Sequence, residues 1–170
     1  TVRKLKALYG LDPAIPVYRV MRRLWDEDPD GRPLLALMCG VARDPLLRAS
    51  VETVLESAVG TEVPHSQLAS TVRASFSTST RDAIISHLAS TWQMAGFLSG
   101  VKPKTRTRAH ATPGAATYAL ALAFMEGGRG SLLLSTLWTR LLDCPADVLL
   151  NLVRQAARRG WVEYRAAGDV

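Results

Sequence analysis

The chain has 170 residues, of which 48% are hydrophobic and 21% are charged. This profile predicts a folded globular protein and excludes a largely disordered one, because there is enough apolar surface to form a core. Lys and Arg total 21 against 15 Asp and Glu, and the net charge of +6 shifts the odds slightly toward nucleic-acid partners. Two cysteines without a CxxC pair, and no signal-peptide pattern, predict reduced thiols in a cytoplasmic protein.

Residues 1–45 are expected to form a helical extension at the N-terminus. Pro16 suits the first turn of a helix, where its missing N–H costs no hydrogen bond. Apolar residues then recur at the spacing of an amphipathic helix, namely Val17, Val20, Met21 and Leu24. The acidic stretch 26–31 contains Pro and Gly and predicts a loop, and the apolar run 34–41 predicts a short buried helix.

Residues 46–113 contain the signals of three helices. Asp44 is suited to cap the first helix, with Pro45 at its first position, and Gly60 is expected to end it. A second helix is expected at about 66–75, with its apolar side chains Leu68, Val72 and Phe76 directed inward. The third helix is expected to open with the capping box Ser79-Thr80-Arg81-Asp82 and to bury Ile85, Leu88, Trp92 and Ala95.

A β-hairpin is expected to follow the third helix. Gly96 is placed to end the helix, and Phe97-Leu98 would then enter a first strand. Gly100 and Pro103 indicate a turn, and the alternating pattern over 104–111 predicts a second strand. Three helices followed by a hairpin predict a mostly α fold in which the sheet is small.

Residues 114–170 are expected to be helical, with helices at about 115–126, 132–142 and 146–159. The last helix is expected to direct Val148, Leu149, Leu152, Val153 and Ala156 inward. Gly160 would end it, and 161–165 has the composition of a strand. Because a helix, a glycine and a strand also follow one another before the basic strand, this part is either a second unit of the same kind or a helical layer that ends in a strand.

Basic residues occupy every second position along the predicted second strand: Lys102, Lys104, Arg106, Arg108 and His110. Since successive side chains of a strand face opposite sides, all five are predicted to share one face. No Asp or Glu occurs between Asp82 and Glu126, so phosphates of a nucleic acid would relieve the repulsion among these charges. The alternative is a solvated edge strand that its charges protect from pairing.

The outward face of the third helix provides the other candidate contacts. Its polar residues away from the apolar stripe are Ser86, His87 and Ser90. Its N-terminal end, where backbone N–H groups attract phosphate, contains Ser79, Thr80 and Arg81. No Arg, Asn or Gln points clearly outward, so phosphate contacts are expected to dominate and sequence specificity to be modest. A small polar face is also what an ordinary solvated helix shows.

Signals of catalysis are weak. His65, His87 and His110 lie on separate predicted elements without metal-ligand spacing. The glycine-rich stretch 127–130 lacks the Lys-Ser/Thr of a phosphate-binding loop, and no G-x-S-x-G sequence occurs. We therefore expect a protein that is not an enzyme and that has no metal site and no cofactor.

Residues 46–113 resemble the winged helix-turn-helix superfamily, in Leu68 and Val72 of the second helix, in 79–95 as the third helix, and in Gly96-Phe97-Leu98 before the basic strand. The layout of the chain is also similar to the small DNA-binding accessory proteins of BREX-type phage-defence loci. The matching stretches are 42–48 (ARDPLLR) and Ser79-Thr80-Arg81 ahead of Ala95-Gly96-Phe97-Leu98. The resemblance implies a winged helix-turn-helix with a short β-wing, and non-catalytic DNA binding within a defence complex.

The expected function is therefore binding of double-stranded DNA, mainly through phosphates, with other subunits of a defence complex as further partners. Two alternatives remain: a protein–protein adaptor, and a transcriptional repressor that acts as a homodimer. No membrane association is expected, since the longest apolar run, 115–125, is about half as long as a bilayer span requires.

Overall fold

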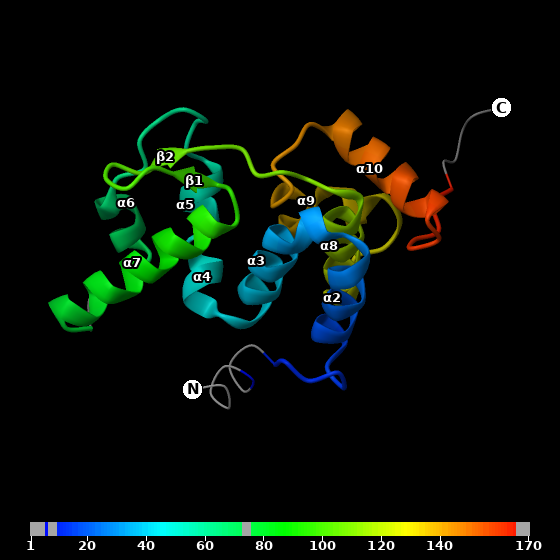
Figure 1. The fold of residues 1–170 in the computed structure, drawn as a ribbon, viewed down its shortest axis with the longest axis horizontal. Helices are drawn as coiled ribbons and strands as arrows, with labels where there is room; N and C mark the ends of the chain where they lie inside the picture. Colours follow the sequence, from blue (N-terminus) through cyan, green and yellow to red (C-terminus); the bar gives the residue numbers. More distant parts are fainter. Residues whose placement is uncertain (1–5, 7–9, 73–75, 166–170) are drawn as a thin grey trace.

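The computed structural model describes residues 6, 10–72 and 76–165. This part of the chain is mostly helical with one two-stranded antiparallel sheet, which confirms the predicted mostly α class (Figure 1). The first elements are α2 (Pro16–Glu27), the 3₁₀ helix η1 (Pro29–Gly31), α3 (Arg32–Arg43), α4 (Pro45–Ala49), α5 (Val51–Leu55), α6 (His65–Ser70) and α7 (Thr78–Met94). They are followed by β1 (Leu98–Ser99), β2 (Thr105–Arg106), α8 (Pro113–Met125), the 3₁₀ helix η2 (Gly130–Ser135), α9 (Leu137–Arg140) and α10 (Ala146–Arg158).

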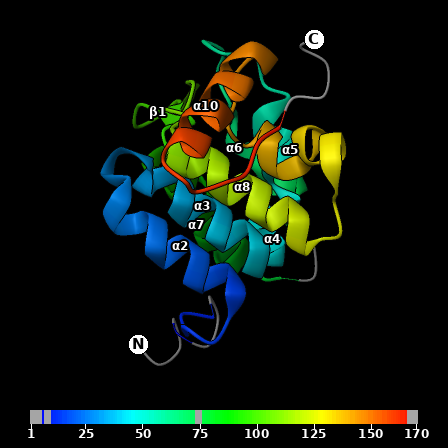
Figure 2. The same cartoon turned by 90° about the vertical axis from the view of Figure 1, so that its right-hand side faces the viewer.

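Helix α8 is the central element of the half of the molecule drawn on the right of Figure 1. It packs against α2, α3, α9 and α10, and Figure 2 shows these helices around it. Most of its residues are buried, and several of these are small, including Ala115, Ala116 and Ala119. A helix that is apolar on all sides is stable only when other elements shield it from water, which is why several helices cover this segment.

The other half contains α4 to α7 and the β1–β2 hairpin, and α3 contacts both α4 and α7. As predicted, α7 buries Ile85, Leu88 and Trp92, with Ala95 just beyond its end. The Trp92 Nε1–H donates to Ser50 Oγ at 2.8 Å, and its ring meets Phe97 edge-on with centroids 5.0 Å apart. These contacts fix the rotation of α7 about its axis and therefore decide which of its residues face outward.

Local signals placed most helix starts correctly. Pro16 and Pro45 occupy first turns, and the Asp44 carboxylate accepts the backbone N–H of Leu46 at 2.9 Å. Gly96 ends α7 with φ +86°, a left-handed conformation that favours glycine. The predicted single helix up to Gly60 is wrong, because it is divided at Ser50 into α4 and α5 and ends at Leu55; at the division the Ser50 N–H is shared between Leu46 O and Leu47 O, and its hydroxyl donates to Leu47 O.

The start of α7 differs from the prediction. Its cap is Ser77, whose Oγ accepts the Thr80 N–H at 3.3 Å, so the predicted capping box at Ser79 is wrong by two residues. Phe76 was expected to point inward, but it is exposed. The preceding helix is shorter than expected and ends at Ser70, and the predicted positions 73–75 lie outside the described residues.

The sheet is shorter than its pattern suggested. Leu98 pairs with Arg106 and Ser99 with Thr105, whereas 107–112 continues toward α8 without forming strand, so a strand over 104–111 is wrong. The far side of β2 is covered by the extended segment 60–63, which the sequence did not reveal. Glu62 and Thr105 form an isolated antiparallel bridge, and Val63 N–H donates to Lys104 O at 2.9 Å. β2 is therefore the middle element of the hairpin region.

The C-terminal predictions are partly wrong. The helix expected at 132–142 is divided into η2 and α9, and Val148 is exposed on α10 rather than inward. Residues 161–165 form no strand; Trp161 lies beneath the Arg159 guanidinium at 4.9 Å and packs on the core. The aromatic and β-branched residues of this segment pack against the core, so the segment needs no partner strand to bury them.

A buried carboxylate joins the start of α8 to the loop after α2. Asp28 accepts hydrogen bonds from Thr112 Oγ1 at 2.6 Å and from Gly114 N–H at 2.8 Å. Gly31 and Gly114 leave room for it, since a Cβ at either position would collide with the carboxylate. Asp28 therefore serves as a cap contributed from a distant part of the chain.

Replacing Asp28 with Ala should lower the free energy of unfolding by about 1–3 kcal/mol, because two buried donors lose their acceptor. Chemical denaturation monitored by circular dichroism measures this change. The matched control is Asp30→Ala, two residues away and exposed, which should change stability by less than about 0.5 kcal/mol. Equal effects of the two substitutions would contradict the bridging role of Asp28.

Candidate functional site

A groove of about 910 Å³ lies between α7 and the loop that joins β1 to β2. From α7 it is lined by Asp82, Ser86 and Ser90, and from the hairpin loop by Lys102 and Lys104. The groove therefore brings together four of the residues singled out in the sequence, two from the helix face and two from the basic run. They converge because Gly100, with φ +84°, turns the hairpin back toward the exposed side of α7.

The exposed face of α7 has the composition that the sequence predicted. Ser86, His87 and Ser90 are all exposed, opposite the buried stripe of the helix. The hydroxyl of Ser90 donates to Ser86 O at 2.8 Å, so it is partly satisfied within the helix. Short side chains of this kind leave the helix backbone accessible to a large ligand.

The first turn of α7 is exposed at Ser79 and Thr80 but not at Arg81. Arg81 is half-buried, and its guanidinium lies 3.4 Å from Ala69 O at the end of α6. Thr80 Oγ1 is hydrogen-bonded to the cap residue Ser77 at 2.8 Å. Arg81 thus links α6 to α7, and only Ser79 and Thr80 of this predicted trio present exposed side chains.

The hairpin loop is anchored to the last turn of α7. Lys104 is half-buried, and its Nζ donates to Gly100 O at 3.0 Å and to the Gln93 side chain. Gln93 Nε2 also donates to Gly100 O at 3.3 Å. Lys102 is exposed at the tip of the loop. The anchoring holds Lys102 at a fixed place beside the groove.

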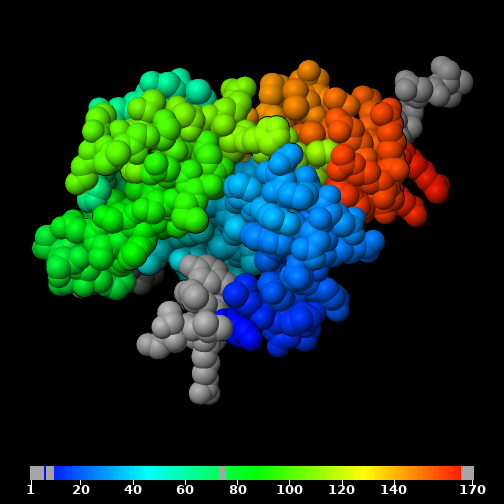
Figure 3. All heavy atoms as spheres, in the orientation of Figure 1, coloured from blue at the N-terminus to red at the C-terminus, as the bar shows by residue number. Residues whose placement is uncertain are grey.

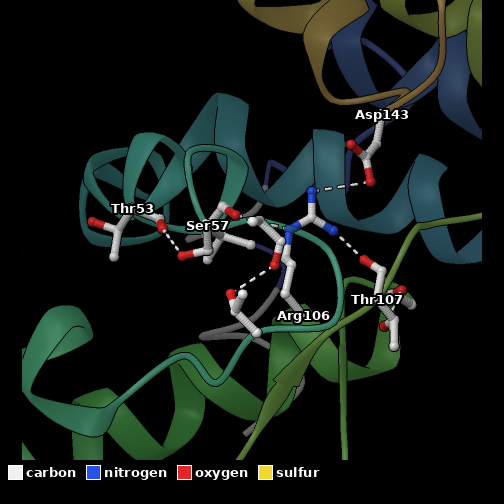
Figure 4. A network of polar contacts seen from close by, with 9 residues as sticks. Thr53, Ser57, Arg106, Thr107 and Asp143 are labelled. Carbon is white, nitrogen blue, oxygen red and sulfur yellow. Dashed lines mark hydrogen bonds and ion pairs between the residues drawn. The ribbon is translucent and has the colours of Figure 1, made fainter.

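Arg106 corrects the prediction of one shared basic face. Its side chain is 1% exposed, so it is not available to a ligand on the surface. Its Nε donates to Val54 O in α5 at 2.8 Å, and its Nη2 forms an ion pair with Asp143 at 3.0 Å (Figure 4). The guanidinium also donates to Thr107 O and lies 5.0 Å from the centre of the Phe97 ring.

The partner Asp143 could not have been identified from the sequence. It lies in the turn between α9 and α10 and adopts φ +50°, a left-handed conformation that Asp tolerates better than most residues. Nothing in its neighbourhood in the sequence indicates an arginine partner. Only the docking of this turn against β2 brings the two charges together.

Arg108 and His110 are exposed, but they lie beyond the sheet and away from the α7 groove. Arg108 lines a separate hollow of about 410 Å³ with Arg140, Asp143 and Cys144. The five predicted basic residues therefore divide among three settings: the groove, the interior and the segment that leads to α8. The strand ends too early to hold all five on one face.

Acidic residues in the groove were not expected. Glu62 and Asp82 line it together with Lys102 and Lys104, so its formal charges are balanced. His65 and the exposed Val101 complete the two rims. An extended polyanion would therefore be attracted by the two lysines of the groove and repelled by its two acids, Asp82 on α7 and Glu62 beside β2.

The two cysteines are not activated for chemistry. Burial raises the pKa of the thiols of Cys39 and Cys144, whereas a nucleophilic thiol needs a lowered pKa. Residues 6, 10–72 and 76–165 contain no group of three His, Cys, Asp or Glu side chains able to hold a metal ion. In the same ranges, no helix combines the length and apolarity needed to cross a membrane.

Replacing Arg106 with Ala should lower the free energy of unfolding by about 3–5 kcal/mol, because Asp143 and Val54 O would lose a buried partner. Thermal or chemical unfolding measures this effect. Arg108→Ala is the matched control: it removes the same side chain two residues further on, where it is exposed, and should cost less than about 0.5 kcal/mol. Similar stabilities of the two variants would show that Arg106 is not buried in solution.

Comparison with known proteins adds no assignment to this geometry. The chain matches no protein-family model, no curated protein and no solved structure. A function must therefore be inferred from the groove, the charges around it and the order of the elements that form it.

Proposed function

We propose that the chain binds double-stranded DNA without catalysis, through α7 and the β1–β2 hairpin. The observation that carries this proposal is the groove in which Ser86 and Ser90 of α7 face Lys102 and Lys104 of the hairpin loop. A helix beside a basic hairpin offers one element to a groove of DNA and another to its phosphate backbone.

The order of the elements supports a winged helix-turn-helix for this region. A helical segment (α4 and α5), the bridging segment 60–63, α6, α7 and the two strands follow one another. β2 pairs with β1 on one side and bonds with 60–63 on the other. In this interpretation α7 is the recognition helix and the loop around Lys102 is the wing.

The composition of α7 supports phosphate-dominated binding. Serine and histidine side chains, which this face exposes, are poorly suited to bidentate hydrogen bonds with base edges. Gln93 could make such a contact, but its side chain is hydrogen-bonded to the hairpin loop. Modest sequence specificity follows, as the side chains that best distinguish base pairs are missing from this face or engaged elsewhere. Such binding fits an accessory subunit of a phage-defence complex, the role that the sequence resemblance suggested.

A second candidate function is a protein–protein adaptor, and one observation favours it. Met94 is 82% exposed at the end of α7, and with Trp25 and Leu37 it lines an apolar hollow of about 420 Å³. An exposed methionine beside an apolar hollow suits a protein partner better than DNA. The dimeric repressor is the case in which that partner is a second copy of the chain.

Lys102→Ala tests the DNA proposal. Loss of one phosphate contact should lower the slope of log K against log salt by roughly one unit, equally for all duplex sequences. Fluorescence anisotropy on two unrelated duplexes at two or more salt concentrations measures it. The matched control is Arg22→Ala, which removes the same charge where it is ion-paired with Asp26 on α2. If the parent protein binds neither duplex, the DNA proposal fails and the adaptor becomes the better candidate.

The acids in the groove give a prediction of opposite sign. Asp82→Asn should strengthen duplex binding by roughly two- to fivefold at low salt, because it removes a charge that repels phosphate, and high salt should abolish the gain. Glu56→Gln is the control, since Glu56 is an exposed acid that does not line the groove. Equal changes in the two variants would mean that only net charge matters and that DNA does not occupy the groove.

A further inference from the structure

We propose that the outer face of α10 is a second phosphate-binding surface, which contacts the same DNA duplex as α7 and the hairpin. This inference rests on the proposed function and extends it to the C-terminal part of the chain. The surface is centred on Arg154 and Arg158, which were not among the candidate residues of the sequence.

The orientation of α10 is fixed by its apolar side. Leu149, Leu152, Val153 and Ala156 are buried, and α10 packs on α8. The opposite side therefore faces solvent, and Asn151, Arg154 and Arg158 on it are exposed. Arg154 and Arg158 are four residues apart and lie on one face, about 6 Å apart along the helix axis.

Six other exposed arginines of the described chain are engaged in ion pairs or aromatic contacts. Arg154 and Arg158, like Arg19, Arg43, Arg108 and Arg165, are exposed without such a partner, and these two are neighbours on one helix face. Arg22, Arg23, Arg48 and Arg140 form ion pairs, and Arg129 and Arg159 lie over aromatic rings. Neither Arg154 nor Arg158 has an ion pair or side-chain hydrogen bond with any residue within 6, 10–72 and 76–165. The acid on the same face, Asp147, lies in the first turn, where it interacts favourably with the helix dipole.

The start of α10 lies beside the basic segment that leaves the hairpin, and Arg154 and Arg158 lie roughly 12 and 18 Å further along the helix axis. Arg108 of that segment lines one hollow with Cys144 and Pro145, directly before α10 begins. The hairpin and α10 both lie at the upper end of the molecule in the two ribbon views, which share a vertical axis (Figures 1 and 2). In the space-filling view, the segment of α10 lies at the surface, at the upper right, where no other segment covers it (Figure 3).

The buried ion pair between Arg106 and Asp143 holds the hairpin and α10 in a fixed relative position, so one ligand can contact both. Arg106 belongs to β2 and Asp143 to the turn before α10, so the pair joins the hairpin to this helix. The hairpin lysines and the α10 arginines, held at a fixed separation, fit a stiff polyanion with regular charges better than they fit a compact acidic protein. Duplex DNA is such a polyanion, and the planar guanidinium binds phosphate oxygens in a bidentate manner.

The test is the double variant Arg154→Ala with Arg158→Ala, compared with Arg22→Ala with Arg23→Ala. Both remove two positive charges, but the second pair is ion-paired on α2. Anisotropy titrations on a duplex of about two helical turns should show a salt slope lower by up to roughly two units for the α10 variant and little change for the control. Arg154→Lys with Arg158→Lys should restore most of the slope, because it retains the charge.

Three outcomes separate this inference from the proposed function. If the parent protein binds no duplex, the proposed function fails and the second surface fails with it. If the parent binds, Lys102→Ala weakens binding and the α10 variant matches its control, then the hairpin proposal stands and the α10 surface is refuted. If the α10 variant binds more weakly than its control on every duplex while melting at the parent temperature, the second surface is supported.

Discussion

The arrangement of the helices and the hairpin in the described chain depends on the interactions of one buried group, the guanidinium of Arg106. It binds a helix carbonyl in α5, a carbonyl in its own strand, the Phe97 ring and the Asp143 carboxylate. Burying a charge is costly, and it is tolerated here because two carbonyls accept its N–H groups and the Asp143 carboxylate lies 3.0 Å away as a counter-charge. One side chain thus connects the hairpin, the helices before it and the turn that leads into α10.

This use of Arg106 changes how the positive charge of the chain is interpreted. A cation in the middle of the basic run stabilises the fold, and several exposed arginines are engaged in ion pairs or aromatic contacts. The cations left free for a ligand are therefore fewer than the composition suggests. Among the described residues they include Lys102 at the hairpin tip, Arg108 and the two arginines of α10, with Arg19, Arg43 and Arg165 elsewhere on the surface. In the groove, Glu62 and Asp82 oppose the lysines. Net charge alone would have overstated the attraction for DNA.

Buried polar contacts between segments distant in the sequence also orient α7 and α8. Ser50 receives the indole N–H of Trp92, and Asp28 caps the start of α8. Each contact satisfies a buried polar group that the local sequence cannot satisfy. The exposed face of α7 and the position of α8 are consequences of these two contacts, and the groove depends on the first of them.

The sequence by itself determined what depends on neighbours within a few residues. The apolar stripes of α7 and most of α10, the cap at Asp44 and the stop at Gly96 follow from helical periodicity and backbone preference. Only the tertiary structure decided which residues of the basic run are exposed, that Arg81 is half-buried between α6 and α7, and that 161–165 forms no strand. A strand requires a partner and a buried charge requires a counter-charge, and alternation within one segment specifies neither. Asp143 and the segment 60–63 supply them from elsewhere in the chain, which is why Arg106 lies inside the protein while Lys102 remains outside.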